Sequence, residues 1–156
     1  MIQVRKVQPK DLEYIYQNKE ALAYNQKSMN DMLENMMIII DNNEICGSGF
    51  YMVIDNKCIL NWIHIKKDHR RNQLGTMLVK TILNSAELQG AIQAYLPGEC
   101  EDFAEFLGFQ RIIESDEIDD INRIYSELYE ADNFNNIYKV SLVGYFKPCN
   151  SNKTCK

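Results

Sequence analysis

One segment near the middle of the chain constrains the fold more than any other. Residues 58–65 are rich in β-branched and aromatic side chains and predict a strand, and residues 66–73 form a basic, polar turn. A helix is predicted directly after the turn, because apolar side chains recur there at helical spacing: Leu74, Met77, Leu78, Ile82 and Ala86. The turn therefore meets the start of a helix, where backbone N–H groups have no intrahelical partner and the helix dipole is positive.

This turn has the chemistry of an anion site. Arg70 and Arg71 add two guanidinium groups to the N–H groups of the helix start, and both kinds of group bind phosphate or pyrophosphate well. The alternative is a plain strand-to-helix connection with a solvated basic tip, because a single degenerate phosphate loop is a weak signal.

The same residues resemble motif A of the GNAT superfamily, the acyl-CoA-dependent N-acyltransferases. That motif reads Arg or Gln, two residues, Gly, one residue, then Gly or Ala. Arg70 takes the first place and Gly75 the last, while Gln73 stands where the family usually has its first glycine. A glutamine still offers its N–H to a phosphate, although its side chain narrows the approach.

A second segment, residues 103–109, resembles the end of GNAT motif B, an aromatic residue followed shortly by Leu-Gly-Phe. It follows motif A after one helix and one strand, as in that family, and the resemblance covers residues 2–146. The resemblance implies an α/β (α+β) fold, the GNAT fold. Its central sheet is mixed, mostly antiparallel, has six to seven strands and is flanked by about four helices.

The pattern of the chain predicts the elements in the same order. Strands are expected over residues 2–7, 36–40, 45–54, 58–65, 91–96, 109–113 and 138–146. Helices are expected from Pro9, from Ser28, over 74–90, over 99–107 and within 115–137. Polar turns at 41–44 and 55–57 indicate a β-meander, and Gly47 and Gly49 indicate a bulge or a close backbone approach. We expect one GNAT domain over 1–147, with 115–137 as a helical acidic insertion and 148–156 as a flexible tail.

The resemblance implies acetyl-CoA as co-substrate, with its pyrophosphate on the helix start and its pantetheine arm paired with the preceding strand. The cofactor-binding residues implied are Ile63, Ile65, Arg70, Arg71, Asn72, Gln73, Leu74, Gly75 and Thr76. A backbone N–H near residues 63–65 would polarise the thioester carbonyl. A primary amine, on a small molecule or on a protein, would then attack the thioester directly.

The general acid cannot be carried over from the family. The position that commonly holds a tyrosine, directly after the first aromatic of motif B, is Ala104 here. Cys100 and Tyr95 are candidates for a place nearby, and both residue types are more often found in a core than in catalysis.

The general base is equally open. Family members use a Glu or His on the strand before the loop as the base. In this chain, the residues whose side chains would face the same side of that strand are Ile59 and Asn61. Of these two, only Asn61 could orient a water or the acceptor. The side chain of His64 would face the other side of the strand, unless a bulge reverses the alternation. The alternative to a catalytic role for His64 is a structural one. Deprotonation of the amine could also proceed through ordered water, or need no base if the acceptor amine has a low pKa.

Composition narrows the function classes. A net charge of −5 over 156 residues argues against general nucleic-acid binding, and no segment has the ~18 consecutive apolar residues of a membrane span. Five cysteines and two histidines show no metal-ligand spacing, so no metal site is expected. A cytoplasmic protein with reduced thiols is the simplest account.

The acidic segment suggests what the acceptor is. Seven carboxylates lie between Asp116 and Asp132, and they would attract a cationic amine. The alternatives are a solvated acidic face that covers the sheet, or a contact in a homodimer. A non-catalytic acyl-CoA-binding or regulatory domain on the same fold remains the alternative to an enzyme.

Overall fold

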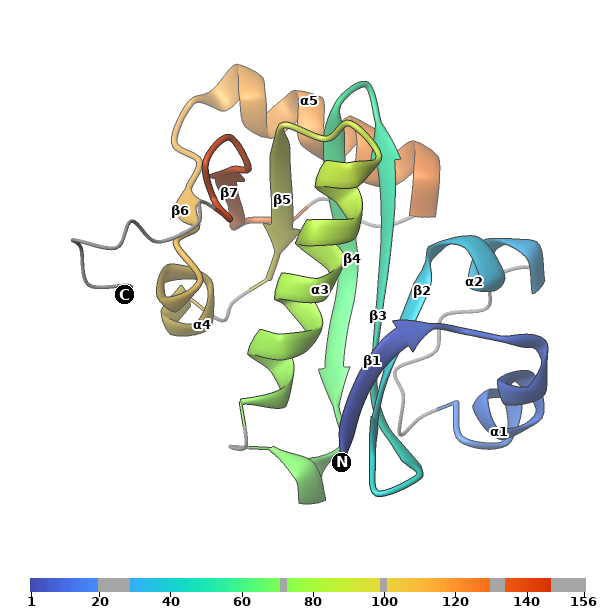
Figure 1. Cartoon of the computed structure of the whole chain (residues 1–156). Helices are drawn as coiled ribbons and strands as arrows, with labels where there is room; N and C mark the ends of the chain where they lie inside the picture. The colour runs from blue at the N-terminus through green and yellow to red at the C-terminus, as the bar shows by residue number, and fades with distance from the viewer. Residues whose placement is uncertain (20–28, 71–72, 99–100, 130–133, 147–156) are drawn as a thin grey trace.

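The computed structural model describes residues 1–19, 29–70, 73–98, 101–129 and 134–146, and the expected tail at 148–156 lies outside these ranges. A seven-stranded sheet in the order β1-β2-β3-β4-β5-β7-β6 forms the centre of the molecule (Figure 1). Its strands are β1 Ile2–Lys6, β2 Met36–Asp41, β3 Glu44–Ile54, β4 Lys57–Ile65, β5 Gln93–Pro97, β6 Gln110–Arg111 and β7 Ile137–Ser141. Of the strand pairs described, β4 with β5 is parallel and the others are antiparallel. The predicted mixed, mostly antiparallel sheet is confirmed.

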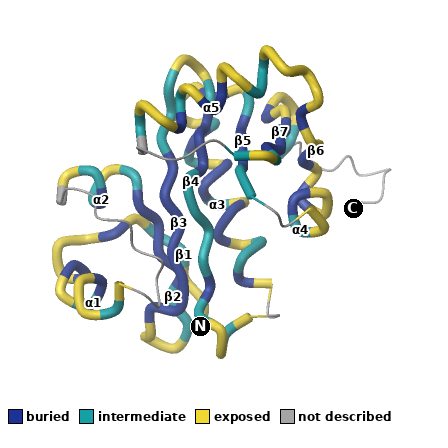
Figure 2. The backbone as a smooth tube through the Cα atoms, turned by 180° about the vertical axis from the view of Figure 1, so that it is seen from behind, coloured by how far each residue is buried: buried dark blue, intermediate teal, exposed yellow. Residues whose placement is uncertain are grey.

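Helices cover both faces of the sheet. They are α1 Leu12–Gln17, α2 Met29–Asn35, α3 Leu74–Leu88, α4 Glu101–Phe106 and α5 Ser115–Tyr129, with short 3-10 turns at Pro9–Asp11 and Lys67–His69. One face is covered by α3 and α4, and the opposite face by α1, α2 and α5 (Figures 1 and 2). The described part of the chain has five α-helices, whereas the family resemblance implied about four. The helix predicted within the acidic segment 115–137 is observed as α5, between β6 and β7.

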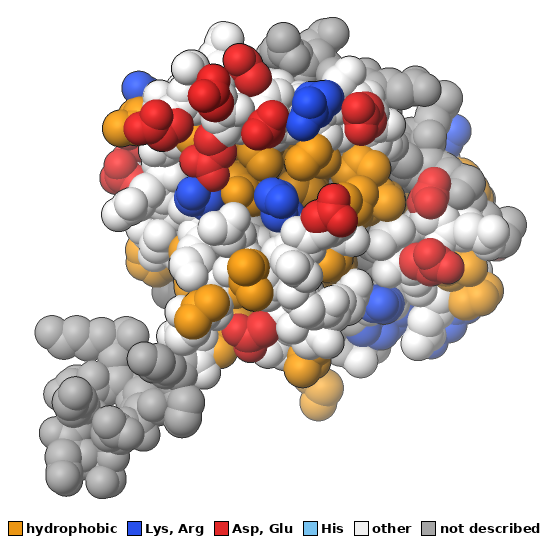
Figure 3. Space-filling view, turned by 90° about the horizontal axis from the view of Figure 1, so that it is seen from above, with side chains coloured by type: hydrophobic (Ala, Val, Ile, Leu, Met, Phe, Trp, Pro, Cys, Tyr) orange, Lys and Arg blue, Asp and Glu red, His pale blue; other side chains and the backbone are white. Residues whose placement is uncertain are grey.

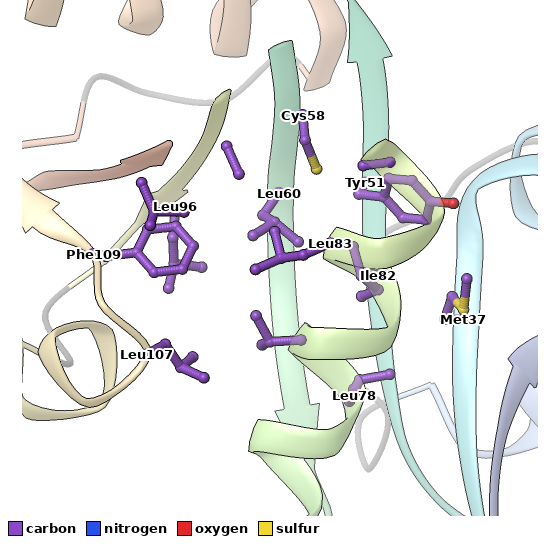
Figure 4. Close-up of a cluster of buried hydrophobic side chains, with 14 of the residues drawn as sticks. Met37, Tyr51, Cys58, Leu60, Leu78, Ile82, Leu83, Leu96, Leu107 and Phe109 are labelled. Atoms are coloured by element: carbon purple, nitrogen blue, oxygen red, sulfur yellow. The ribbon is translucent and has the colours of Figure 1, made fainter. Parts of the chain in front are cut away.

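Each face of the sheet has its own hydrophobic core. On the first face, α3 directs Leu78, Ile82 and Leu83 onto the sheet, where they meet buried side chains such as Leu60 (Figure 4). On the second face, buried side chains of α1, α2 and α5 pack together with Phe50 of β3. No helix in the described residues is long and apolar enough to cross a membrane.

Two tight turns build the predicted meander. Asn42 and Asn43 join β2 to β3, and Asp55 and Asn56 join β3 to β4, all four with positive φ. Two-residue hairpins of type I′ need positive φ at both central positions, and Asn and Asp tolerate it better than other non-glycine residues.

The last two strands are shorter than predicted. β6 has only two residues because Phe109 is held by the end of α4, its N–H donating to Ala104 O at 2.9 Å. β7 ends at Ser141, because a turn follows in which Tyr145 N–H donates to Leu142 O at 3.1 Å. β5 begins two residues later than expected, at Gln93.

Two β-bulges interrupt the meander, and both adjoin the predicted site. Ile39 pairs with Gly47 and Ile40 with Ile45, so Cys46 is an extra residue in β3. Phe50 pairs with Trp62 and Tyr51 with Leu60, so Asn61 is an extra residue in β4.

The glycines of β3 also allow a close approach. A Cβ on Gly47 would lie 2.7 Å from His64 O, and one on Gly49 would lie 2.8 Å from Ile63 Cδ1. The predicted close backbone approach is confirmed at Gly47, which directly follows the bulge residue Cys46. At Gly49 the nearest atoms are the side-chain ends of Ile82 and Ile63.

Candidate active site

The bulge at Asn61 decides which way the second half of β4 faces. Before the bulge, Ile59 belongs to the core beneath α5 and Leu60 to the core beneath α3. After it, Trp62 packs in the same core as Ile59. Regular alternation would have placed Trp62 on the face of Leu60. The extra residue therefore places His64 on the Ile59 face, as expected if a bulge were present.

A gap opens between β4 and β5 directly after this point. Their pairing runs from Lys57 and Gln93 to Ile59 and Tyr95, and no described pair follows. The space between the separated strands is a cavity of about 100 Å³, lined by Asn61, Trp62, Ile63, Leu96, Pro97, Gly98, Phe103 and Tyr138.

Backbone groups of β4 face this gap. Lys66 N–H donates to Cys46 O at 2.8 Å, so the peptide groups of residue 66 point towards β3. Because neighbouring residues of a strand point their peptide groups to opposite sides, those of Ile63 and Ile65 point away from β3 and into the gap. Arg70 Nε donates to Ile65 O at 2.9 Å and holds the loop against the strand.

The start of α3 has the geometry of an anion site. Gln73 is the N-cap residue in the left-handed conformation, with φ 60° and ψ 16°. The first bond of the helix joins Met77 N–H to Gln73 O at 3.1 Å, so the N–H groups of Leu74, Gly75 and Thr76 have no partner within the helix. The side chain of Gln73 does not cap them, and the first turn of α3 carries no acidic residue.

A larger cleft joins the helix start to the gap. Its volume is about 500 Å³, and its lining is Ile63, His64, Ile65, His69, Arg70, Gln73, Leu74, Gly75, Thr76 and Phe103. It shares Ile63 and Phe103 with the cavity between β4 and β5. The two spaces thus line one path from the start of α3 to the gap.

Most of the residues predicted from the sequence meet in this path. Seven of the predicted cofactor-binding residues line the larger cleft: Ile63, Ile65, Arg70, Gln73, Leu74, Gly75 and Thr76. His64 lines it too, and Asn61 lines the gap. Arg71, Asn72 and Cys100 lie outside the described residues.

Seven residues of the path were not predicted as site residues: Trp62, Leu96, Pro97, Gly98, Phe103, His69 and Tyr138. Phe103 of α4 lines both spaces, His69 lines the larger cleft, and Tyr138 of β7 lines the gap. Phe103 could have been found, because it is the first aromatic of motif B. Tyr138 carries no local signal, because only the order of strands brings β7 beside β5.

Two positions considered for the general acid belong to the core. Ala104 is fully buried. Tyr95 is also buried, and its hydroxyl lies within hydrogen-bond distance of two acceptors, Gln93 Oε1 at 2.9 Å and Glu117 Oε2 at 3.2 Å. Burial and the neighbouring Glu117 carboxylate raise the pKa of Tyr95 above its ordinary value. Tyr95 does not line the described cleft and is held by α5.

A polar cluster supports the loop between β4 and α3. Glu44 Oε1 lies 3.7 Å from Lys66 Nζ, and Glu44 Oε2 lies 3.8 Å from His69 Nε2. Lys66 also donates a hydrogen bond to the hydroxyl of Tyr14. Among the described residues, no group of three or more His, Cys, Asp or Glu side chains could hold a metal ion.

Solved structures of similar fold cover nearly the whole chain. An acetyltransferase of the GNAT family from Staphylococcus aureus Mu50 is 18% identical with a TM-score of 0.64, covering 91% of this chain and 99% of its own. The ribosomal-protein-S18-alanine N-acetyltransferase of Escherichia coli is 14% identical with a TM-score of 0.62, covering 99% and 100%. The PaiA N-acetyltransferase of Thermoplasma acidophilum, solved with coenzyme A, is 13% identical with a TM-score of 0.63, covering 90% and 99%. At these identities the likeness establishes the fold.

Sequence comparison establishes the family. No curated protein sequence matches the chain. The model of the acetyltransferase (GNAT) family matches residues 2–131, which is most of the chain and includes both motifs. The chain therefore belongs to the acetyltransferase (GNAT) family.

Proposed function

We propose that this protein transfers an acetyl group from acetyl-CoA to a primary amine by direct attack. The observation that carries the proposal is the path from the start of α3 to the gap between β4 and β5, formed by two spaces that share Ile63 and Phe103 in their linings. One end of it offers N–H groups and Arg70 to a pyrophosphate. The other end offers the peptide groups of Ile63 and Ile65 to an acylated pantetheine arm. The PaiA N-acetyltransferase, which shares the fold, was solved with coenzyme A.

The reaction needs little from side chains. The neutral amine nitrogen attacks the thioester carbonyl carbon, and a backbone N–H of Ile63 or Ile65 stabilises the negative charge that develops on the carbonyl oxygen. The C–S bond then breaks, the CoA thiolate leaves, and the proton lost by the amine passes through solvent or an acid to the sulfur. His64 of β4 and Tyr138 of β7 are the polar candidates for handling these protons, and Asn61 could orient a water or the acceptor.

We propose further that the acceptor is positively charged before it reacts. The net charge of −5 and the exposed acids of α5, namely Asp116, Asp119, Asp120 and Glu127, favour a polyamine, an aminoglycoside-like amine or a lysine-rich peptide. Figure 3 shows acidic side chains gathered on the upper face of the molecule, with fewer basic ones among them.

One observation favours a second candidate, a non-catalytic acyl-CoA-binding domain. The position of the family tyrosine is Ala104, which is fully buried, and Tyr95 is held by α5. Neither residue offers an acid to the gap. Such a domain would bind CoA through the same path and release no product.

Turnover separates the two candidates. Acetyl-CoA should be incubated with the protein and spermidine, an aminoglycoside, a lysine-rich peptide or a peptide with only an α-amine. CoA release is followed by a thiol reagent and the product by mass. We expect acetylated product with at least one cationic amine, with EDTA present throughout. Binding of CoA without any acetylated product would favour the non-catalytic domain, and no binding of CoA would refute both.

A further inference from the structure

A buried hydroxyl lies at the point where β4 and β5 separate. Tyr125 of α5 is fully buried, and its hydroxyl donates a hydrogen bond to Leu60 O. Tyr95 O lies 3.3 Å from the same hydroxyl. Leu60 belongs to β4 and Tyr95 to β5, so one side chain bridges the two strands where their pairing ends.

The sequence of β5 explains why a side chain is needed there. Lys57 faces Ile54 across the two-residue turn, so the peptide groups of Lys57 point towards β3. Peptide direction alternates along a strand, so the peptide groups of Leu60, three residues later, point to the other side, towards β5. With Ile59 opposite Tyr95, the next bond of a parallel ladder would join Leu60 O to the N–H of residue 97. Residue 97 is proline, which has no N–H. The ladder must end at this step, and Leu60 O needs another donor.

Tyr125 supplies that donor from outside the sheet. Its ring is fixed by packing in the core beneath α5, and it meets the ring of Phe134 edge-on at 5.1 Å between centroids. A rigid ring with its hydroxyl on Leu60 O keeps β4 and β5 apart at a set separation. The bulge residue Asn61 follows directly, and Ile63 comes two residues later.

We infer that Tyr125 is a positioning residue for acetyl transfer, which rests on the function proposed above. Its hydroxyl fixes the base of the gap between β4 and β5. The peptide groups of Ile63 are thereby held where the thioester carbonyl of acetyl-CoA would lie. The acidic helix α5 is then part of the catalytic framework through its buried face, whatever its exposed acids do.

The position of Ile63 matters more for the transition state than for cofactor binding. The pyrophosphate end of the path is formed by the start of α3 and Arg70, where Leu74 belongs to the core beneath α3, whereas Tyr125 belongs to the core on the opposite face of the sheet. An oxyanion donor that moves by a fraction of an ångström loses its effect on the developing charge. Loss of the hydroxyl should therefore lower kcat and leave the Kd of CoA nearly unchanged.

Tyr125→Phe tests this with Tyr95→Phe as the matched control. Both variants delete one buried hydroxyl in the same core, but the hydroxyl of Tyr95 bonds to Gln93 and Glu117 and not to the backbone of β4. We expect kcat to fall roughly tenfold or more in Tyr125→Phe, with the Kd of CoA changed by less than about threefold. Tyr95→Phe should keep kcat within about twofold of wild type at temperatures well below its melting point.

A second readout does not need turnover. Hydrogen exchange at the amides of Ile63 and Ile65 should slow on addition of CoA to wild type, and slow less in Tyr125→Phe. If wild type produces no acetylated amine, the proposed function fails, while the exchange data still report on Tyr125. If Tyr125→Phe matches Tyr95→Phe in kcat and in CoA-induced exchange protection, the hydroxyl is only structural and the inference is wrong.

Discussion

A Cβ atom on Gly75 would lie 3.4 Å from Cζ of Phe103, so the first turn of α3 and the inner side of α4 approach each other closely. The same Cβ would lie 3.8 Å from Cγ1 of Ile65. All three residues line the larger cleft. A side chain at position 75 would therefore occupy space that the proposed cofactor needs, without meeting backbone.

Substitution at Gly75 should separate binding from folding. We expect Gly75→Ala to change the free energy of unfolding by less than about 1 kcal/mol, because the new methyl group meets only side chains. Gly75→Val should raise the Kd of CoA roughly tenfold or more, and Gly75→Ala by less. Calorimetry with CoA and thermal unfolding of the same samples measure both quantities. Wild-type affinity in Gly75→Val would mean that the cofactor does not approach the start of α3.

The charge of Arg70 should matter for CoA and little for folding. Arg70 is exposed, and reversing its charge replaces attraction to phosphate by repulsion. We expect Arg70→Glu to raise the Kd of CoA by roughly tenfold or more, and increasing salt to narrow the difference from wild type. Arg111→Glu is the control, because Arg111 is exposed on β6 and does not line the cleft. Equal effects of the two substitutions would refute a specific role for Arg70.

Replacing each of the two glycines of β3 by alanine should lower the free energy of unfolding by different amounts. A Cβ on Gly47 would meet the backbone oxygen of His64 at 2.7 Å, whereas one on Gly49 would meet the flexible ends of Ile82 and Ile63. We expect Gly47→Ala to lower the free energy of unfolding by about 2–3 kcal/mol and Gly49→Ala by about 1 kcal/mol. Urea unfolding of both variants tests this order, which would be contradicted if Gly49→Ala were the more damaging.

Asp11 should contribute to stability in a pH-dependent way. Burial raises its pKa, but hydrogen bonds from Arg5 and from Gln8 N–H, with the charges of Arg5 and Lys10, outweigh burial and hold the pKa below its ordinary value of 3.8. A carboxyl group that is more acidic in the folded state stabilises it fully above the unfolded pKa. This stabilisation is lost as the pH falls through the folded pKa.

Asp11→Asn should accordingly lower the free energy of unfolding by about 2 kcal/mol at pH 7, with the difference from wild type shrinking below about pH 4. Urea unfolding at a series of pH values measures the difference. Glu13→Gln, at an exposed position of α1, is the control and should have little effect. A difference that stayed constant down to pH 2 would show that the carboxylate charge is not what stabilises the fold.

The exposed acids of α5 should act at long range on a cationic acceptor. We expect the combined variant Asp116→Asn, Asp119→Asn and Asp120→Asn to raise the KM of a polyamine by about two- to fivefold at low salt. The effect should vanish near 0.5 M salt, since the screening length is then only about 4–5 Å. The Kd of CoA is the internal control. If the KM of the polyamine at low salt is the same in the variant and the wild type, the exposed acids of α5 do not contribute to the choice of acceptor.

Local patterns determined much of this protein from the sequence alone. Helical spacing from Leu74 to Ala86 and the basic turn before it predicted the start of α3 as the anion site, because both depend on residues close together in the chain. Turn residues such as Asn43 and Asn56 predicted the meander in the same way, since their backbone preference needs no distant partner. The conformation of Gln73 is local in the same way. Its φ is positive, which glycine adopts without steric cost, and this explains why the family favours glycine at that place.

The tertiary structure alone decided how the gap is built. Asn61 becomes a bulge only because β3 pairs on both sides of it, and this pairing turns His64 to the face of Ile59. Pro97 ends the parallel ladder, but only the packing of α5 brings Tyr125 to the carbonyl of Leu60, 65 residues away in the sequence. The acids of α5 are visible in the sequence, whereas the role of its buried face is not. Pairing and packing between distant segments depend on the whole fold, and no local pattern encodes them.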